Sequence, residues 1–573
     1  MYIQINNHGY IAREGQSILE FCNKHDIPIP NLCYNAGLKP EARCRICVVE
    51  VNGKIQSACN TMLQDQMEIH TNTPHLRKLR KMNLELMMSQ DHSMAHDDTR
   101  ESDFAHYARE YGAGENGYQF RRDDPYYIDT NPSLIRDSRK CILCGKCVQA
   151  CQDIQGVTAI GFTYRSHESR ICPAFEHPMA EVACALCGQC ANVCPTGAIQ
   201  ERSYLDEVKE VIADPDKFVV VQTAPAVRAS IGETQAIPPG TLLTGQLVTA
   251  LKQLGFDRVL DTNFAADLTI MEEGTEFIER VQNGGTLPLI TSCSPGWIRF
   301  IEYFYPELLP HVSSCKSPQQ MFGATVKTYY AQKHGIDPGN MVSVSIMPCT
   351  AKKFEMQRDE MNDSGFTDVD YVLTTRELGR WLNEKEIDLL ALEKTDYDPL
   401  MGSSTGAAVI FGTTGGVMEA ALRTVADILE NKDLPQLDYE PVRGFKGIKE
   451  AQLRVAGIDV SVAVAHGLKQ ARTVLEWIKT GERNYHFVEV MACPGGCIGG
   501  GGQPKTNDQS IREKRAQALY QADRDLPLRK SHQNPEIIAL YEQFFDKPGS
   551  KKAHHLLHTH YVNRKVTSKT PPI

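Results

Sequence analysis

The 573-residue sequence predicts an α/β protein in which a large two-lobed unit with parallel-rich sheets follows smaller, cysteine-rich α+β modules. Nineteen cysteines stand in ordered blocks, most of them before residue 200. From about residue 210, apolar segments alternate with helical stretches, which is typical of buried parallel strands. At about 150 residues per domain, this length corresponds to three or four units, one of them large.

The composition excludes two classes of function. The net charge of −10, without a basic stripe interleaved with aromatics, opposes nucleic-acid binding. No apolar run approaches the roughly 20 residues of a membrane span, so we expect no membrane insertion. The amino terminus carries no signal-peptide pattern, which predicts a cytoplasmic location. Thiols stay reduced there, so closely spaced cysteines indicate metal binding rather than disulfides.

Residues 1–75 begin with alternating, strand-like segments and are expected to form the first module. Four of its cysteines form a C-x2-C pair with one distant cysteine on each side: Cys33, Cys44, Cys47 and Cys59. This arrangement resembles the [2Fe–2S] domain of plant-type ferredoxins, with a longer first gap than usual. Cys22 lies on a helical pattern outside this set, and we expect it to be a buried structural thiol.

Residues 76–130 are predicted to be a helical and then polar linker. The sequence has no cysteine between Cys59 and Cys141. His92, His96 and His106 fall in this stretch and are interpreted as ordinary surface histidines.

Residues 131–209 contain two copies of the C-x2-C-x2-C-x3-C spacing of two-cluster bacterial ferredoxins, in which three thiolates bind one [4Fe–4S] cluster and the fourth binds the other. The first predicted ligand set is Cys141, Cys144, Cys147 and Cys194. The second is Cys184, Cys187, Cys190 and Cys151. Structural zinc is disfavoured because it uses closed four-cysteine sets, not interleaved ones. Cys172 is interpreted as a buried structural thiol.

Residues 210–540 are expected to form one large α/β unit with two lobes around a shared cleft. Its five apolar runs are KFVVVQTAP, LPLITSCSPGW, VSVSIMPCT, AVIFGTTGG and HFVEVMACPGG. In parallel sheets, ligand sites lie at the carboxyl ends of the strands, and cysteines follow several of these runs. Residues 541–573 are a C-terminal segment whose basic, His-rich end receives no function.

Three motifs in the large unit resemble the signatures of the [FeFe]-hydrogenases. The first is TSCSPGW, from Thr291 to Trp297; the second is SIMPCTAKKFE with Cys349; the third is EVMACPGGCIGGGGQP with Cys493 and Cys497. The resemblance implies an H-cluster, which is a [4Fe–4S] cube joined through a cysteine sulfur to a di-iron centre with CO, cyanide and a dithiolate. It also implies an enzyme that interconverts H2 with protons and electrons.

The same resemblance assigns pocket residues. It places Pro225, Met347, Pro348 and Met491 around the di-iron unit and makes Lys352 the donor to a cyanide ligand. A charge of this kind would otherwise be costly in an apolar cavity. Outside the motifs, prolines and methionines of this kind are more simply core packing.

The resemblance further assigns a proton relay to Glu273, Glu276 and Ser313. Residues three apart on a helix share a face, so both carboxylates can line one path. Proton transfer needs such groups within hydrogen-bond reach of one another.

The first signature departs from the family, which normally has two adjacent cysteines where this chain has Cys293 and Ser294. If the roles of the family's two cysteines are assigned by position, Cys293 is the catalytic proton relay and Ser294 is left to bind the cube. Ligand chemistry favours a thiolate over a hydroxyl, so we prefer Cys293 as the fourth cube ligand with Ser294 beside the open iron. The opposite assignment stays open. Cys315 is interpreted as a buried structural thiol.

The resemblance implies electron transfer from the [2Fe–2S] site, or from a ferredoxin-like partner, through two [4Fe–4S] clusters to the H-cluster. Maturation proteins that supply the H-cluster are implied partners. Relatives with a longer electron chain bind a further cluster through one histidine and three cysteines, which residues 76–130 cannot do in that way. A hydrogenase subunit of a larger complex, linked to formate dehydrogenase or NADH, is the alternative. A non-catalytic H2 sensor or a cluster-trafficking relative is less favoured, because no extra signalling module is evident and the pocket motifs are retained.

Overall fold

The computed structural model describes residues 1–89, 102–114, 128–455, 457–506 and 508–565. The described chain divides into two compact units. The first contains Met1–Asp153, Thr158–Val182 and Gln189–Gln200. The second contains Ile154–Val157, Ala183–Gly188 and the chain from Glu201 onward. The cysteine-rich region is therefore shared between the units rather than forming a separate one.

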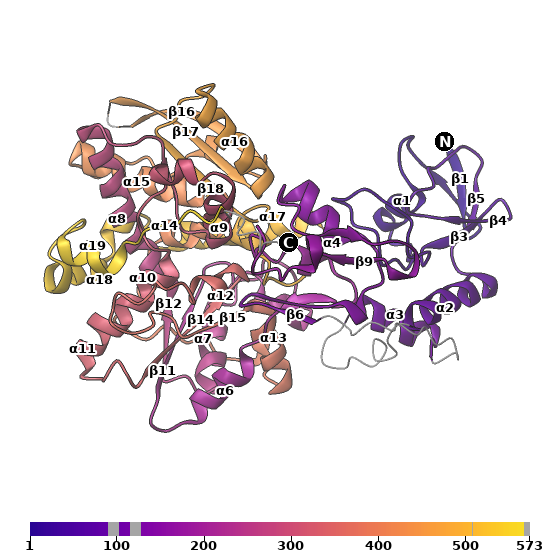
Figure 1. The fold of residues 1–573 in the computed structure, drawn as a ribbon, viewed down its shortest axis with the longest axis horizontal. Helices are drawn as coiled ribbons and strands as arrows, with labels where there is room; N and C mark the ends of the chain where they lie inside the picture. The colour runs from indigo at the N-terminus through magenta and orange to yellow at the C-terminus, as the bar shows by residue number, and fades with distance from the viewer. Residues whose placement is uncertain (90–101, 115–127, 456, 507, 566–573) are drawn as a thin grey trace, which may run out of the picture. The chain divides into compact units, whose positions relative to one another are not determined.

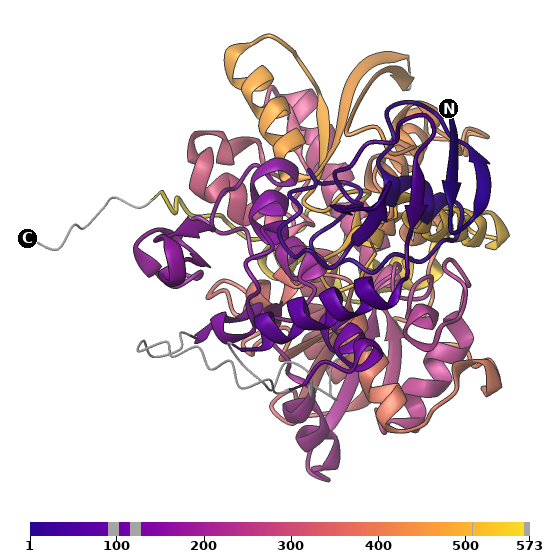
Figure 2. The ribbon, with the colours of Figure 1, turned by 90° about the vertical axis from the view of Figure 1, so that its right-hand side faces the viewer.

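The amino-terminal module of the first unit is a five-stranded sheet in the order β2-β1-β5-β3-β4. Its strands are β1 (Tyr2–Ile5), β2 (His8–Ile11), β3 (Val48–Val51), β4 (Lys54–Ser57) and β5 (Glu68–His70). β1 and β5 are parallel and the other pairs antiparallel. Helix α1 (Ile18–Lys24) begins with a capping box between Ser17 and Glu20 and buries its apolar face on the sheet core. The indigo strands are visible beside the amino terminus in Figures 1 and 2.

Two helices follow this sheet, α2 (Pro74–Met88) and α3 (Asp103–Tyr111). Arg80 of α2 is buried and donates hydrogen bonds to backbone oxygens of Ile46, Val48 and Thr71, which fixes the helix to the module. The exposed position of His106 on α3 agrees with its interpretation as a surface histidine. His92 and His96 lie outside the described residues.

The rest of the first unit consists of short elements. They are β6 (Ile128–Thr130), β7 (Leu134–Asp137), α4 (Lys146–Gln149), β8 (Gly161–Thr163), β9 (Arg170–Cys172), α5 (Gln189–Val193) and β10 (Ile199–Glu201). The two cysteine repeats share one backbone pattern. Leu143 and Gly145 in the first repeat, and Leu186 and Gly188 in the second, all have positive φ angles of 52–80°. A glycine adopts this conformation without strain, and it turns the chain between successive cysteines.

The second unit contains a fully parallel sheet in the order β12-β11-β14-β15. Its strands are β11 (Phe218–Thr223), β12 (Arg258–Asp261), β14 (Met341–Met347) and β15 (Tyr371–Thr374). Both faces are covered, because Val219 and Val221 pack with helices α6 and α7 while Val220 packs with α8 and α10. This explains the continuous apolar runs in the sequence.

A second sheet in this unit has the order β13-β18-β17-β16. Its strands are β13 (Leu289–Ile290), β16 (Ile448–Val455), β17 (Ile458–His466) and β18 (Phe487–Met491). β13 and β17 pair parallel to β18, and β16 adds an antiparallel edge to β17. Both sheets thus fit the parallel-rich expectation.

Helix α8 (Thr262–Asn283) lies between the two sheets, where Figure 1 shows it beside α15. Ala266 and Ile270 join the core of the second sheet, while Phe264 and Leu268 join that of the first.

The other helices are α6 (Leu205–Ala213), α7 (Thr244–Gln253), α9 (Pro295–Phe304), α10 (Pro318–Thr325), α11 (Ala331–His334), α12 (Ala351–Glu355), α13 (Thr375–Glu384), α14 (Gly406–Val409), α15 (Gly416–Glu430), α16 (Leu468–Thr480), α17 (Gln509–Asp525), α18 (Pro535–Leu540) and α19 (Lys551–Leu557).

One expected strand is wrong. The run AVIFGTTGG lies in α14 and a following 3-10 turn, Ile410–Gly412, and both are buried. A short apolar run does not distinguish a buried strand from a buried helical segment by periodicity. Across the residues that the structure describes, no helix has both the length and the apolar composition needed to cross a bilayer.

Candidate active site

A cavity lies in the second unit, where the carboxyl ends of strands from both sheets meet. Residues that directly follow β11, β14 and β18 contribute to its wall, as expected for parallel strands. The site residues predicted from the sequence that line it are Pro225, Cys293, Ser294, Met347, Pro348, Cys349, Lys352, Met491, Cys493 and Cys497. All three signatures are therefore brought together.

Cys349, Cys493 and Cys497 supply three of the four thiols of this cavity, and Cys293 supplies the other. Burial is the main cause that raises the pKa of Cys497, to about 12, so this sulfur becomes a thiolate only with a bound metal. The glycine-rich loop packs too closely for side chains, because a Cβ on Gly500 would lie 2.1 Å from the carbonyl oxygen of Pro348. Soft donors and a close backbone fit an iron–sulfur group.

Lys352 is held at the cavity wall by three interactions. Its Nζ donates to Ser317 Oγ at 2.6 Å, to Glu355 Oε2 at 2.9 Å and to the carbonyl oxygen of Cys293 at 3.2 Å. Gln319 also donates to Glu355. The buried carboxylate offsets the cost of placing an ammonium in an apolar cavity.

Cys293 and Ser294 have different surroundings although they are adjacent. Cys293 lines the cavity, where burial, and then the charges of Glu273 and Cys497, raise the pKa of its thiol. Ser294 Oγ instead accepts a hydrogen bond of 3.2 Å from the backbone N–H of Ala492, the residue before Cys493. Ser294 is also the residue before α9 and uses its carbonyl oxygen to begin that helix.

The three relay residues predicted from the sequence lie together beside this point. Glu273 is 1% exposed, and its carboxyl oxygens make no hydrogen bond of normal geometry within the described residues, although the Ser313 hydroxyl is close enough to lower the pKa of this carboxyl. Burial, and then repulsion from Glu276, raise the pKa of Glu273 to about 8. Ser313 donates to Glu276 Oε2 at 2.8 Å, and Arg280 donates to Glu276 Oε1 at 2.6 Å. Arg280 is partly exposed, so these groups lead from the cavity wall toward the surface.

The cysteines of the amino-terminal module are also brought together. Cys33 is in hydrogen-bond contact with Cys44 and Cys59, and Cys47 with Cys59. All four are buried. Cys22 is buried within the module's apolar core, where burial raises its pKa to about 12, in agreement with a structural role.

The first dicluster set lines a separate cavity of about 410 Å³. Its members are Cys141, Cys144, Cys147 and Cys194. The second set is divided, with Cys151 and Cys190 in the first unit and Cys184 and Cys187 in the second. Cys172 is buried on β9, and its sulfur lies 3.0 Å from Thr163 Oγ1.

Several residues that support the site were not predicted from the sequence. Glu355 and Arg280 stand three and four positions after Lys352 and Glu276, so helical spacing would have indicated both as charge partners. His558, in the segment that received no function, is buried and lies near Glu276 and Cys315. No local signal indicates that contact.

Comparison with known proteins identifies the modules. The sequence matches the family models for the iron only hydrogenase large subunit, C-terminal domain (217–501), the iron hydrogenase small subunit (509–564), a 2Fe-2S iron-sulfur cluster binding domain (1–74) and a 4Fe-4S dicluster domain (140–198). The small-subunit match extends past the expected domain end at residue 540.

Two relatives that match nearly the full chain, and one solved structure, are also hydrogenases. The chain is 46% identical to the NADP-reducing hydrogenase subunit HndD of Solidesulfovibrio fructosivorans, over 96% of this chain and 97% of that protein. It is 42% identical to iron hydrogenase 1 of Clostridium pasteurianum, over 98% of this chain and 99% of that protein. An apo [FeFe]-hydrogenase HydA1 structure from Chlamydomonas reinhardtii superposes with a TM-score of 0.58 at 44% identity, covering 64% of this chain and all of that one.

These similarities confirm the fold class and the expected cofactor types: a [2Fe–2S] cluster, [4Fe–4S] clusters and an H-cluster. The chain belongs to the iron-only, or [FeFe], hydrogenases and is a modular hydrogenase enzyme of that family.

Proposed function

We propose that this hydrogenase interconverts two protons and two electrons with H2 and exchanges the electrons with ferredoxin or a similar iron–sulfur carrier. One observation carries the proposal: a single cavity combines the three motif cysteines, Lys352 and the inner end of a buried proton path. When bound there, the H-cluster supplies the open iron site at which H2 forms and splits. The protein residues hold that group, exclude water and move protons.

We assign Cys349, Cys493 and Cys497 to the cube of the H-cluster and Ser294 to its fourth position. The hydrogen bond from Ala492 N–H orients Ser294 Oγ toward the residue before Cys493, and the charge of Glu273 acts on the Cys293 thiol, as a relay role requires. The contacts thus favour the assignment by position over the preference for Cys293 from ligand chemistry. A hydroxyl is a harder and weaker iron ligand than a thiolate, so we expect a less tightly held cube.

Lys352 positions the di-iron unit through its ammonium. Ser317 and Glu355 fix the direction of this side chain, so the charge is already oriented toward the cavity before a ligand arrives. Pro225, Met347, Pro348 and Met491 complete an apolar wall that excludes water.

Protons move along Cys293, Glu273, Ser313 and Glu276, and Arg280 holds the outer carboxylate in place without itself passing protons. A pKa of about 8 keeps Glu273 mostly protonated at pH 7, so it can give a proton to a Cys293 thiolate and be reprotonated from Ser313. The hydrogen bonds of Ser313 and Arg280 to Glu276 support the outer part of the path.

Local contacts support the first and the last step of the electron path. In the first unit, Lys39 N–H donates to Gln149 Oε1 at 2.9 Å and Gln149 Nε2 donates to the Lys39 carbonyl at 3.2 Å, which joins the [2Fe–2S] loop to the first cysteine repeat. In the second unit, Thr350 Oγ1 donates to the Leu186 carbonyl at 2.9 Å, which joins the Cys184–Gly188 loop to the residue after Cys349.

A subunit role in a larger complex is the second candidate. The relative from Solidesulfovibrio fructosivorans that is similar over nearly its full length is named as a subunit of an NADP-reducing hydrogenase. Without a cysteine between Cys59 and Cys141, electrons must also enter this chain by a shortened route. We further propose a cytoplasmic location, which keeps the nineteen cysteines reduced, and H-cluster maturation proteins as partners.

Infrared spectroscopy of the matured protein tests the proposal. Sharp CO and cyanide bands, with about ten accessory irons from one two-iron and two four-iron clusters, are expected. H2 evolution should follow from reduced ferredoxin added to the purified chain alone. Bands without ferredoxin-dependent turnover, together with co-purified redox subunits, would favour the complex; bands without turnover from any donor would contradict an enzymatic role.

A further inference from the structure

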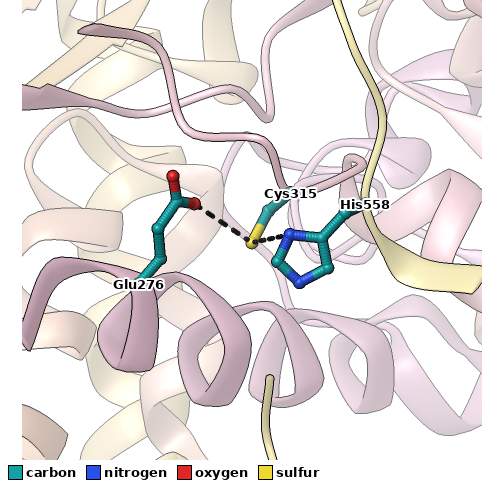
Figure 3. A group of neighbouring side chains, drawn as sticks. All are labelled: Glu276, Cys315 and His558. Atoms are coloured by element: carbon teal, nitrogen blue, oxygen red, sulfur yellow. Dashed lines mark hydrogen bonds between the residues drawn. The ribbon is translucent and has the colours of Figure 1, made fainter. Parts of the chain in front are cut away.

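Glu276, Cys315 and His558 form a group of metal-binding side chains outside the H-cluster cavity. Their ligand atoms, the Glu276 carboxylate oxygen, the Cys315 sulfur and the His558 Nδ1, all lie within 4.8 Å of one another. The Cys315 sulfur is 3.9 Å from Glu276 Oε2 and 4.0 Å from His558 Nδ1. Figure 3 shows the carboxylate and the imidazole on either side of the sulfur.

The backbone fixes this arrangement although the residues are far apart in the sequence. Cys315 and His558 form an isolated antiparallel bridge, with Lys316 N–H bonded to the Leu557 carbonyl and Thr559 N–H to the Ser314 carbonyl. Glu276, the third residue of the group, lies on helix α8. Chain segments on both sides of the sulfur are therefore held in place before any ion binds.

The imidazole of His558 is prepared for coordination. Its Nε2 lies 3.0 Å from Glu272 Oε2, and a carboxylate at this nitrogen favours the tautomer with the proton on Nε2. In that tautomer the Nδ1 lone pair is available to Ser314 Oγ, at 2.8 Å, or to an ion. Tyr541 and Gly549 donate to the same carboxylate and hold it. Histidines that bind metals usually have such a carboxylate on the other ring nitrogen, and it sets both tautomer and orientation.

The donor set selects the class of ion. One sulfur, one imidazole nitrogen and one carboxylate oxygen suit zinc and similar divalent ions, whereas magnesium and calcium prefer oxygen alone. Tetrahedral zinc holds such ligands about 3.5 Å apart. The Cys315 sulfur, at 3.9 Å and 4.0 Å from the other two ligand atoms, is close to that spacing, and the carboxylate oxygen and the imidazole nitrogen lie within 4.8 Å of each other. Ser314 Oγ, 2.8 Å from His558 Nδ1, or water can take the fourth position.

We propose that Glu276, Cys315 and His558 bind a zinc-like divalent cation and that the bound cation closes the proton path. On binding, the Cys315 thiol releases its proton to the solvent and the metal–sulfur bond forms. The cation occupies Glu276 Oε2, the oxygen that accepts the hydrogen bond from Ser313. The link between Ser313 and Glu276 is then lost. The closing of the proton path rests on the proposed relay, whereas the binding of the ion does not.

Zinc binding is measured first, on protein that holds all its clusters, by adding ZnCl2 and recording zinc retained after gel filtration. Zinc K-edge absorption should show one sulfur at about 2.3 Å and nitrogen or oxygen at about 2.0 Å. Cys315→Ala and His558→Gln should each weaken binding at least about tenfold. Cys172→Ala, another buried thiol, and His554→Gln, which stacks on His558, serve as matched controls and should bind as the parent does.

The rate of H2 evolution is then compared with and without zinc, each variant against its own zinc-free rate. We expect zinc to inhibit the parent and EDTA to reverse the inhibition. In Cys315→Ala, the zinc concentration needed for the same inhibition should be at least tenfold higher. A zinc edge without sulfur, or equal affinity in Cys315→Ala, would overturn the site. Sulfur-bound zinc with an unchanged rate would overturn the closure of the path. Iron content and the CO and cyanide bands show that each variant is folded and loaded, so these outcomes are separate from a failure of the proposed function.

Discussion

Replacing Glu273 with glutamine removes one buried ionisable group while keeping its shape. The pKa of this carboxyl is about 8 in the folded protein against an ordinary value of 4.5, so the folded state binds the proton more tightly than the unfolded state. Its contribution to stability is therefore fully present below about pH 4.5 and is lost as the pH rises to about 8. The difference corresponds to about 5 kcal/mol at most, from roughly 1.4 kcal/mol per pKa unit.

The assay follows thermal unfolding of protein without the di-iron unit at several values between pH 5.5 and 8.5. We expect the Tm of the parent to fall more steeply with pH than that of Glu273→Gln, and the variant to be the more stable protein at pH 8.5. In loaded protein, H2 evolution by Glu273→Gln should drop by roughly a hundredfold or more, because an amide cannot pass on a proton. The parent rate should also decline above about pH 8, where Glu273 loses its proton.

Glu279→Gln is the matched control, since this carboxyl lies on the same helix and is exposed. It should change neither the pH dependence of the Tm nor the rate by more than about twofold. Parallel Tm curves for the parent and Glu273→Gln would refute a raised pKa at this position. An unchanged rate in Glu273→Gln would refute its place in the proton path.

Three further substitutions test the cavity. Ser294→Cys should raise the iron retained in the cube and the turnover rate, because a thiolate is the softer ligand; equal iron retention and turnover would speak against Ser294 as a ligand position. Lys352→Asn should remove the CO and cyanide bands and lower the free energy of unfolding by about 3 kcal/mol, because Glu355 loses its ion-pair partner. Adding Glu355→Gln should restore the Tm but not the bands. Retained bands in Lys352→Asn would contradict the anchoring role. Gly500→Ala would place a Cβ 2.1 Å from a backbone oxygen and should lower active-site iron, whereas Gly161→Ala, with open space around it, should not; equal iron in both would contradict the close packing.

Much of the site could be predicted because its residues stand in short motifs at strand ends. The spacing of Cys349, Cys493 and Cys497 relative to their apolar runs was sufficient to place them in one cavity. The roles of Cys293 and Ser294 could not be separated in this way, since adjacent residues differ only in the direction of their side chains. For Ser294 that direction depends on a hydrogen bond from Ala492 N–H, which lies elsewhere in the chain.

Other features needed the fold itself. The run AVIFGTTGG carries the composition of a buried strand, but tertiary packing places it in α14 and a 3-10 turn. His558 and Cys315 are 243 positions apart, and only the bridge between their segments brings them together. Arg280, by contrast, was open to prediction, because it stands four residues after Glu276 on one helix.

The division of roles between Cys293 and Ser294 is the central claim about this active site, and electron paramagnetic resonance tests it most directly. The measurement uses reduced protein that carries the cube but lacks the di-iron unit, in Cys293→Ala and Ser294→Ala. We expect Cys293→Ala to keep the cube signal and its iron, and Ser294→Ala to shift or lose the signal. Loss of the cube in Cys293→Ala with an unchanged signal in Ser294→Ala would contradict this expectation and make Cys293 the fourth ligand.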